Sequence, residues 1–272
     1  MNNRRTVRSC LFLLFSLIII QCNNNPYKAT NRSYKKQVKQ LSKTIKEIPS
    51  QDSVVNGSWV GTVNFNLRKP NFVIIHHTAQ NSCDQTLKTF TTVRTQVSAH
   101  YVICKDGTIH HMLNDYLRAW HGGLAKWGNN TDINSSSIGI ELDNNGSEPF
   151  TEQQINSLIN LLAVLKKKYT IPTANFIGHA DIAPTRKVDP NVYFPWKRLS
   201  DSGYGVWWND TTGIQVPSSF NSIEALKIIG YDIKDSNAVI QAFKRKYELL
   251  DSSSILKEED KKILYTLYKK FE

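Results

Sequence analysis

The sequence predicts an α/β fold in which a mixed central β-sheet is flanked by helices. Short apolar runs that suit buried strands, residues 71–75 and 137–142, end at polar residues. The clearest helical pattern is 151–169, where Thr151 and Gln154 form a capping box ahead of leucines and isoleucines at helical spacing. Strands that alternate with helices and long loops are typical of a sheet covered by helices.

The remaining elements of this main domain, 56–212, are shorter. A helix is predicted over 85–93, and strands are predicted over 100–104, 108–112 and 175–177. Asp106-Gly107 supplies the turn between the strands 100–104 and 108–112. Beyond about residue 216 the chain has no His or Cys and shows three helical patterns, 222–229, 236–247 and 257–271. We therefore expect a small helical module over 217–272.

The net charge of +11 is concentrated at the N-terminus. Residues 1–21 carry +3 and residues 22–50 carry +6, which leaves only +2 for the rest of the chain. A nucleic-acid-binding domain would carry its basic residues on its own surface. We therefore expect no nucleic-acid partner.

The first residues predict an export signal. Arg4, Arg5 and Arg8 precede the apolar run 10–20, which is too short to span a bilayer but suits a signal peptide over 1–21. The run ends in Ile-Gln-Cys and resembles the lipobox of bacterial lipoproteins, in which Cys22 would be acylated. A plain signal peptide or a short membrane anchor is the alternative. The lipoprotein reading places the chain in the bacterial cell envelope, anchored in a lipid bilayer through Cys22, and favours the outer membrane facing the periplasm.

Residues 22–55 have the composition of a basic tether. Within it, Val38, Leu41, Ile45 and Ile48 recur at helical spacing among lysines. Such a helix could lie on an anionic lipid surface or pack on the main domain, or the segment could remain flexible. The sequence leaves these alternatives open. It also leaves open whether Cys83 and Cys104 pair, because a disulfide requires neighbouring Cα atoms.

Several chemically active residues follow predicted strands. His76 and His77 come directly after 71–75, Glu141 lies late in 137–142, and His179 follows 175–177. Two neutral imidazoles and one carboxylate can hold a zinc ion and leave a fourth position for water. Asp189 could complete such a site, but spacing alone favours turn formation beside prolines for Asp189 and for Asp181.

Four separated motifs favour a functional role for Asp189 and Asp181 over turn formation. IIHHTA, AWHGG, SIGIEL and GHADIAPTRKVDP occur in this order between about residues 70 and 200. Together they resemble the zinc-dependent N-acetylmuramoyl-L-alanine amidases of the amidase-2 family, which share a fold with peptidoglycan-recognition proteins. The chain looks most similar to AmiD-type lipoprotein amidases, which carry a small C-terminal helical peptidoglycan-binding module. The resemblance makes 56–212 the catalytic domain and 217–272 that module.

The resemblance also implies a role for each matching residue. The implied zinc (Zn²⁺) ligands are His76, His179 and Asp189, with His77 the weaker candidate. The implied catalytic residues are Glu141 and Lys187. Trp120 and His121 would line the substrate groove, Asp181 would orient His179 from behind, and His100 would be structural.

The implied reaction is hydrolysis of the amide bond between N-acetylmuramic acid and L-alanine in peptidoglycan or its muropeptide fragments, for cell-wall turnover or recycling. A non-catalytic peptidoglycan-binding protein and a metallopeptidase that cuts within the stem peptide are the alternatives. We expect the protein to be a monomer.

Overall fold

The structure is a computed structural model that describes residues 25–47, 60–248 and 251–272. The chain divides into two compact units, Met1–Val63 and Asn64–Glu272. The predicted signal peptide 1–21 and the predicted lipidation site Cys22 lie outside the described residues. No helix in the described parts of the chain is long and apolar enough to cross a membrane.

The described residues of the first unit form the helix α1 (Lys28–Lys46). It begins before the first residue of the predicted amphipathic pattern and carries seven basic residues and no acidic one. Its basic residues are Lys28, Arg32, Lys35, Lys36, Lys39, Lys43 and Lys46. None of the residues of α1 is buried, and the apolar side chains of Leu41 and Ile45 are exposed. The tether segment therefore forms a helix with a basic side and an uncovered apolar side.

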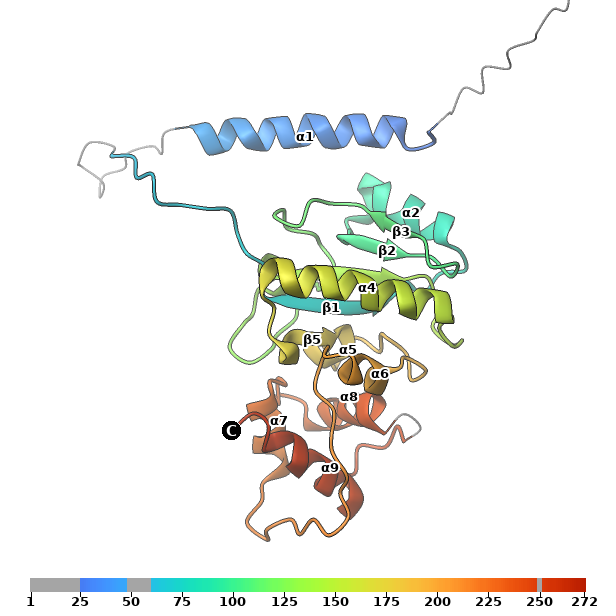
Figure 1. Cartoon of the computed structure of the whole chain (residues 1–272), viewed down its shortest axis with the longest axis vertical. Helices are drawn as coiled ribbons and strands as arrows, with labels where there is room; N and C mark the ends of the chain where they lie inside the picture. The colour runs from blue at the N-terminus through green and yellow to red at the C-terminus, as the bar shows by residue number, and fades with distance from the viewer. Residues whose placement is uncertain (1–24, 48–59, 249–250) are drawn as a thin grey trace, which may run out of the picture. The chain divides into compact units, whose positions relative to one another are not determined.

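The second unit is built on a mixed sheet, drawn in Figure 1. Within the described residues the sheet has five strands in the order β3-β2-β4-β1-β5. The strands are β1 (Phe72–His77), β2 (Tyr101–Ile103), β3 (Ile109–His111), β4 (Ser137–Leu142) and β5 (Phe176–Gly178). All neighbours run parallel except β2 and β3, which form an antiparallel pair. This arrangement confirms the predicted fold class.

The two faces of the sheet are covered by different helices. Val73 and Ile75 of β1 point to a core shared with α4 (Glu152–Tyr169). Ile74, which points to the other face, belongs to a second core that includes the C-terminal helices. The capping box of α4 forms as predicted, with the Thr151 side chain accepting from the Gln154 backbone. Burial on both faces explains why the strands read as continuous apolar runs.

The C-terminal helices are α7 (Ser222–Ile229), α8 (Ser236–Tyr247) and α9 (Glu258–Tyr268). The first two match their predicted bounds, and α9 is shorter at both ends than the predicted segment 257–271. Leu226 and Phe243 are buried in one core with Ile177 of β5. These helices therefore form part of the same compact unit as the sheet.

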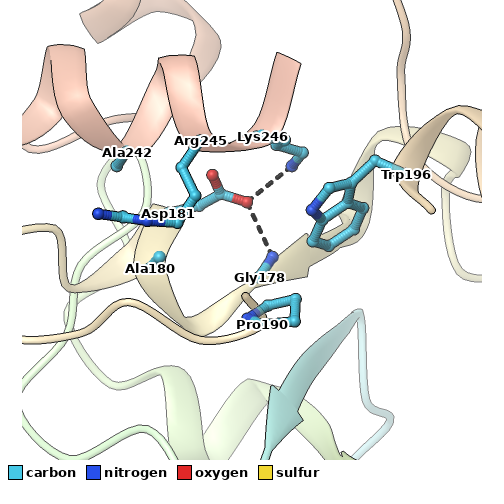
Figure 2. A pocket seen from close by; sticks show the side chains of 8 residues that line it. All are labelled: Gly178, Ala180, Asp181, Pro190, Trp196, Ala242, Arg245 and Lys246. Atoms are coloured by element: carbon cyan, nitrogen blue, oxygen red, sulfur yellow. Dashed lines mark hydrogen bonds and ion pairs between the residues drawn. The ribbon is translucent and has the colours of Figure 1, made fainter. Parts of the chain in front are cut away.

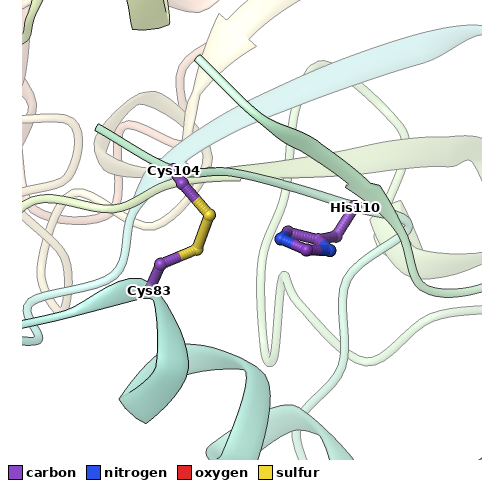
Figure 3. Close-up of side chains that lie close together, drawn as sticks. All are labelled: Cys83, Cys104 and His110. Atoms are coloured by element: carbon purple, nitrogen blue, oxygen red, sulfur yellow. A yellow bond between two sulfur atoms is a disulfide. The ribbon is translucent and has the colours of Figure 1, made fainter. Parts of the chain in front are cut away.

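A disulfide joins Cys83 to Cys104, with their Cα atoms 5.3 Å apart (Figure 3). Cys83 begins α2 (Cys83–Thr91), and Cys104 directly follows β2. The ring of His110 on β3 lies beside the pair. The pairing that the sequence left open is thus present, and it ties α2 to the sheet.

The remaining elements are single turns or short helices. They are η1 (Val93–Thr95), α3 (Ile133–Ser136), η2 (Thr173–Asn175), α5 (His179–Ile182) and α6 (Trp196–Asp201). The segment 178–196 contains three prolines, and α5 lies at its start. This helix ends before Pro184, so the prolines limit its length without preventing its first turn.

Candidate active site and metal centre

The side chains of His76, His179 and Asp189 meet at one edge of the sheet. His76 lies near the end of β1, and His179 begins α5 directly after β5, the parallel neighbour of β1. The carboxyl ends of parallel neighbours lie at the same sheet edge, where loops carry functional groups. Asp189 is brought back to this edge by a hydrogen bond from the Ala180 backbone N–H to its carbonyl, 2.7 Å long. All three side chains are buried.

Three atoms of these residues form a small triangle. The two Nδ1 atoms of His76 and His179 are 2.9 Å apart, and Asp189 Oδ2 is 3.1 Å from the first and 3.0 Å from the second. Ligands around a tetrahedral zinc ion with bonds of about 2 Å are separated by roughly 3.3 Å. The triangle therefore has the size of three ligands of one such ion.

The hydrogen bonds behind His76 fix which of its nitrogens is free. Ser137 Oγ donates to the Ile133 carbonyl at 2.6 Å, and His121 Nε2 lies 3.1 Å from the same Oγ. His121 Nε2–H therefore donates to Ser137, and His121 Nδ1 accepts from His76 Nε2–H at 3.1 Å. This leaves the Nδ1 lone pair of His76 directed at the triangle.

His179 is oriented in the same way from another side. Its Nε2 lies 3.1 Å from the Gly122 carbonyl, to which it donates. Its Nδ1 lone pair thus also faces the triangle, together with a carboxylate oxygen of Asp189. Three buried acceptors that face one another without a proton between them require a cation. The donor set of two imidazoles and one carboxylate fits zinc.

The surroundings of His76 and Asp189 keep both side chains in the protonation state that a metal needs. Burial and the neighbouring His179 lower the pKa of His76 to about 4, so His76 is neutral at physiological pH. Burial alone would raise the pKa of Asp189, but the neighbouring imidazoles of His179 and His76 hold this pKa well below its usual value. A neutral imidazole and an ionised carboxylate are the metal-binding forms.

Glu141 and Lys187 lie beside this cluster. Glu141 on β4 is paired in register with His76 on β1, so both side chains project from the same face of the sheet. Its Oε2 is buried and has no hydrogen-bond partner among the described residues. Burial and the charge of Asp189 raise the pKa of Glu141 to about 8, and the half-buried Lys187 acts against this rise. A carboxylate and an ammonium thus border the cluster.

His121 is buried behind His76. It is 8% exposed and packs between His76 and Ser137. A Cβ added to Gly139 of β4 would come within 2.4 Å of the His121 ring, so the absent side chain at Gly139 makes room for it. These contacts hold His76, and the implied place of His121 in the substrate groove stays a prediction.

Asp181 makes no direct hydrogen bond to the ring that it was expected to orient. Its carboxylate accepts hydrogen bonds from the Gly178 backbone, Lys246 and Tyr231, and its hydrogen-bond partners among the described residues do not include the His179 ring. The partner of His179 Nε2 is the Gly122 carbonyl instead. Asp181 can therefore affect His179 only through the backbone of α5.

Trp120, which the resemblance assigns to the substrate groove, borders an open hollow. Its side chain is 51% exposed and borders a hollow of about 470 Å³. The other lining residues are Gln96, Arg118, Gly123, Leu124 and Asn134. An exposed indole in such a groove suits contact with the flat faces of a sugar or peptide.

His77 and His100 each accept a hydrogen bond from a backbone N–H group. Residues alternate between the faces of a strand, so His77 points away from the cluster, and its Nδ1 accepts from the Asn191 backbone at 3.0 Å. His100 Nδ1 accepts from the Gly139 backbone at 3.1 Å and is fully buried. Only one of the two adjacent histidines thus faces the site, as strand alternation predicts.

Several supporting residues were not identified from the sequence. Ser137, Gly139 and Gly122 act on the two histidines through contacts with residues on other elements. Lys246 and Tyr231 reach Asp181 from the C-terminal helices, across sequence separations of 65 and 50 residues. Ser137 and Gly139 lie within the SIGIEL motif, which was the one available signal for them. No local pattern marks Lys246 or Tyr231.

Comparison with known proteins places this geometry in a family. Residues 66–192 match a family model described as N-acetylmuramoyl-L-alanine amidase, Amidase_2. The N-acetylmuramoyl-L-alanine amidase AmiD of Escherichia coli (strain K12) is 34% identical over 202 residues, which are 63% of this chain and 72% of that protein. The 1,6-anhydro-N-acetylmuramyl-L-alanine amidase AmpD of Haemophilus influenzae is 41% identical over 108 residues, 39% of this chain and 59% of that protein.

Two solved structures have the same fold. The complex of E. coli AmiD with the substrate anhydro-N-acetylmuramic acid-L-Ala-D-gamma-Glu-L-Lys matches with a TM-score of 0.69 and 29% identity over 77% of this chain and 93% of that chain. The complex of AmpDh3 from Pseudomonas aeruginosa with anhydromuramic pentapeptide matches with a TM-score of 0.69 and 27% identity over 79% and 97%. The chain therefore belongs to the amidase-2 family of N-acetylmuramoyl-L-alanine amidases.

Proposed function

We propose that this protein hydrolyses the amide bond between N-acetylmuramic acid and L-alanine in peptidoglycan or its fragments, in cell-wall turnover or recycling. The observation that carries the proposal is the triangle of His76, His179 and Asp189 acceptor atoms beside the unpartnered carboxylate of Glu141. The relatives support the substrate class, since AmiD and AmpDh3 were solved with anhydromuramyl peptides.

The metal that we propose is zinc, held by His76 Nδ1, His179 Nδ1 and one carboxylate oxygen of Asp189. Two nitrogens and one oxygen are a frequent ligand set of catalytic zinc sites, which keep one position open. When bound, such an ion polarises the scissile carbonyl and lowers the pKa of the attacking water to about 7.

The residues of the chain then have separate tasks. Glu141 accepts the proton of the attacking water and returns it to the leaving amine, for which a buried carboxylate with a raised pKa is suited. Lys187 faces the oxyanion that develops on the scissile carbonyl, and its positive charge stabilises that oxyanion. Trp120 contacts the substrate in the open groove.

Analysis of the products tests this function. The zinc-loaded protein is incubated with purified murein, and the released peptides are identified by mass spectrometry. We expect free stem peptides that begin with L-alanine, and no release by a Glu141→Gln variant that still holds zinc. Stem peptides cut internally would indicate a metallopeptidase. Murein binding without release by the zinc-loaded protein would indicate a non-catalytic binding protein.

We also propose that the protein is a lipid-anchored monomer of the bacterial cell envelope, in the outer membrane and facing the periplasm. The signal-like residues 1–21 and the lipobox ending at Cys22 support the anchor, and the seven basic residues of α1 suit a nearby anionic lipid surface. Incorporation of labelled palmitate into the wild-type chain, but not into Cys22→Ser, tests the anchor. Membrane fractionation tests the location, and sedimentation of the Cys22→Ser protein tests the monomer.

A further inference from the structure

We propose that the C-terminal helices hold the metal centre in place, with Lys246 and Tyr231 acting through Asp181 as positioning residues for His179. A module that only bound peptidoglycan would not need to contact the ligand-bearing helix of the catalytic domain. This inference rests on the proposed metal site.

The contact is a buried polar cluster beside α5, and Figure 2 shows Asp181, Lys246 and Gly178 of this cluster. Asp181 Oδ2 accepts from Lys246 Nζ at 2.6 Å and from the Gly178 backbone N–H at 2.8 Å, and Asp181 Oδ1 accepts from the Tyr231 hydroxyl at 2.8 Å. The Lys246 and Asp181 side chains are only 6% and 3% exposed. The ammonium of Lys246 also lies over the Trp196 ring, 4.4 Å from its centroid. Two C-terminal residues thus fix both oxygens of one carboxylate.

The Asp181 carboxylate stabilises the backbone of α5, the helix that carries His179. Gly178 is the N-cap of α5, and His179 is the first residue of that helix. A helix of one turn has too few hydrogen bonds to be stable alone and depends on tertiary contacts. Asp181 is the third residue of α5, and its carboxylate accepts a hydrogen bond from the backbone N–H of the N-cap, Gly178. Lys246 and Tyr231 hold the same carboxylate in place. The orientation of His179 therefore depends on contacts made by α8 and by the turn after α7.

The loop that carries Gly122, the hydrogen-bond partner of His179, also contacts the C-terminal segment. Gly122, whose carbonyl accepts from His179, belongs to the loop that continues to Trp127 and Gly128. Gly128 N–H donates to the Gly230 carbonyl at 2.6 Å. A Cβ added to Gly230 would lie 2.4 Å from the Trp127 ring, so glycine is needed for this close approach.

An ion pair in the same loop strengthens the attachment. Lys126 Nζ lies 3.2 Å from Asp232, directly beyond Gly230 and Tyr231. The turn after α7 thus contacts both the Gly122 loop and Asp181, the two groups that orient the His179 side chain. Burying the Lys246–Asp181 ion pair costs desolvation energy, so the pair is poor evidence for stability alone. A role in orientation accounts for its position directly behind a metal ligand.

Zinc affinity measured on the full-length chain tests the inference. The variants are Lys246→Met, Tyr231→Phe and Lys246→Arg, and the matched control is Lys244→Met. Lys244 is a buried lysine of the same helix, but its ion pairs are with Asp251 and Asp260 of the C-terminal region. Zinc affinity is measured by competition with a chromophoric chelator, at a temperature where circular dichroism shows each variant to be folded. The absorption spectrum of the cobalt(II)-loaded protein reports the ligand geometry.

We expect zinc affinity to fall about tenfold or more in Lys246→Met and less in Tyr231→Phe, as for other groups that orient metal ligands. The cobalt spectrum should change in both variants, and Lys246→Arg should recover part of the affinity. Lys244→Met should lower the melting temperature with little change in zinc affinity. Tyr231→Phe removes only a hydroxyl and keeps the test valid if Lys246→Met does not fold.

Two outcomes would overturn the inference. One is an unchanged zinc affinity and cobalt spectrum in Lys246→Met and Tyr231→Phe, which would make their contacts purely structural. The other is an equal loss of affinity in Lys244→Met, which would tie the metal site to general stability and not to Asp181. Failure of the proposed function would look different, because the wild-type protein itself would then bind no zinc or release no stem peptide.

Discussion

The Nδ1 atoms of His76 and His179 lie 2.9 Å apart. The Nε2–H groups of both rings are already used, by His121 and by the Gly122 carbonyl, so each ring in its neutral form has a lone pair and no proton on Nδ1. Asp189 adds a third acceptor. Such a buried cluster of acceptors is favourable only around a cation.

The ligand assignment predicts a sharp difference between adjacent histidines. His179→Ala and Asp189→Ala should each reduce zinc affinity by more than about 100-fold, because three protein ligands hold the ion. His77→Ala should retain zinc, since His77 points to the opposite face of its strand. Metal content after dialysis, measured by mass spectrometry, distinguishes them. Loss of zinc from His77→Ala with retention in Asp189→Ala would contradict the assignment.

The role of Glu141 predicts a loss of rate without a loss of metal. Glu141→Gln keeps the shape of the side chain but cannot accept a proton, so kcat should fall by about 10²-fold to 10⁴-fold. Zinc content should stay at the wild-type level, because Glu141 is not one of the three ligand candidates. Stem-peptide release by the zinc-loaded variant, followed by chromatography, provides the measurement. Release at a near wild-type rate would exclude Glu141 as the general base.

Glu141 also makes the stability of the metal-free protein depend on pH. Its folded pKa of about 8 lies above the unfolded value of 4.5, so the folded state holds its proton more tightly. The stabilisation is fully present below about pH 4.5 and is lost as the pH rises through 8, by up to about 5 kcal/mol. Urea unfolding of wild type and Glu141→Gln over pH 5 to 8.5 tests this.

Wild type and Glu141→Gln must be compared because His76 changes the free energy of unfolding with pH in the opposite direction. Its folded pKa of about 4 lies below its usual value of 6.5, so its contribution is lost as the pH falls from 6.5 to 4. His76 is common to both proteins and cancels in the difference. A difference in unfolding free energy that does not change between pH 5 and 8.5 would show that Glu141 is not protonated in the folded state.

Local patterns predicted the parts of this molecule that depend on neighbouring residues. The strand 137–142 and the helices 222–229 and 236–247 have the predicted bounds, because apolar periodicity and caps determine them within a few residues. The meeting of His76, His179 and Asp189 could be anticipated only from the family motifs. Spacing alone favoured a turn-forming role for Asp189.

What the sequence did not indicate, or left open, concerns contacts between distant segments. His121 lies in a loop without periodicity, and its burial depends on the missing side chain of Gly139 on another strand. Asp181 is bound by Lys246, whose position in α8 resembles that of any other helical lysine. The Cys83–Cys104 disulfide likewise depends on where α2 packs on the sheet. Such contacts follow from the tertiary fold and leave no short-range signal.

The hydrogen-bond chain behind His76 predicts that His121 supports the metal. His121→Phe removes the acceptor for His76 Nε2–H and should reduce zinc affinity by about 10-fold to 100-fold. Gly139→Ala should act in the same direction, because its Cβ would clash with the His121 ring. Chelator competition measures both. Full zinc affinity combined with a raised KM for His121→Phe would instead support the original assignment of His121 to the substrate groove.

The disulfide predicts how reduction affects the second unit. The Cys83–Cys104 bridge closes a loop with a sequence separation of 21 residues. Its removal by Cys83→Ser with Cys104→Ser should lower the free energy of unfolding by about 3 kcal/mol, mainly because the unfolded chain gains freedom. Neither cysteine belongs to the His76–His179–Asp189 cluster, so zinc affinity should remain close to wild type. Urea unfolding measures the first effect and chelator competition the second. A large loss of zinc affinity in the folded double variant would mean that the bridge, through α2 and β2, also orders the sheet edge that carries the site.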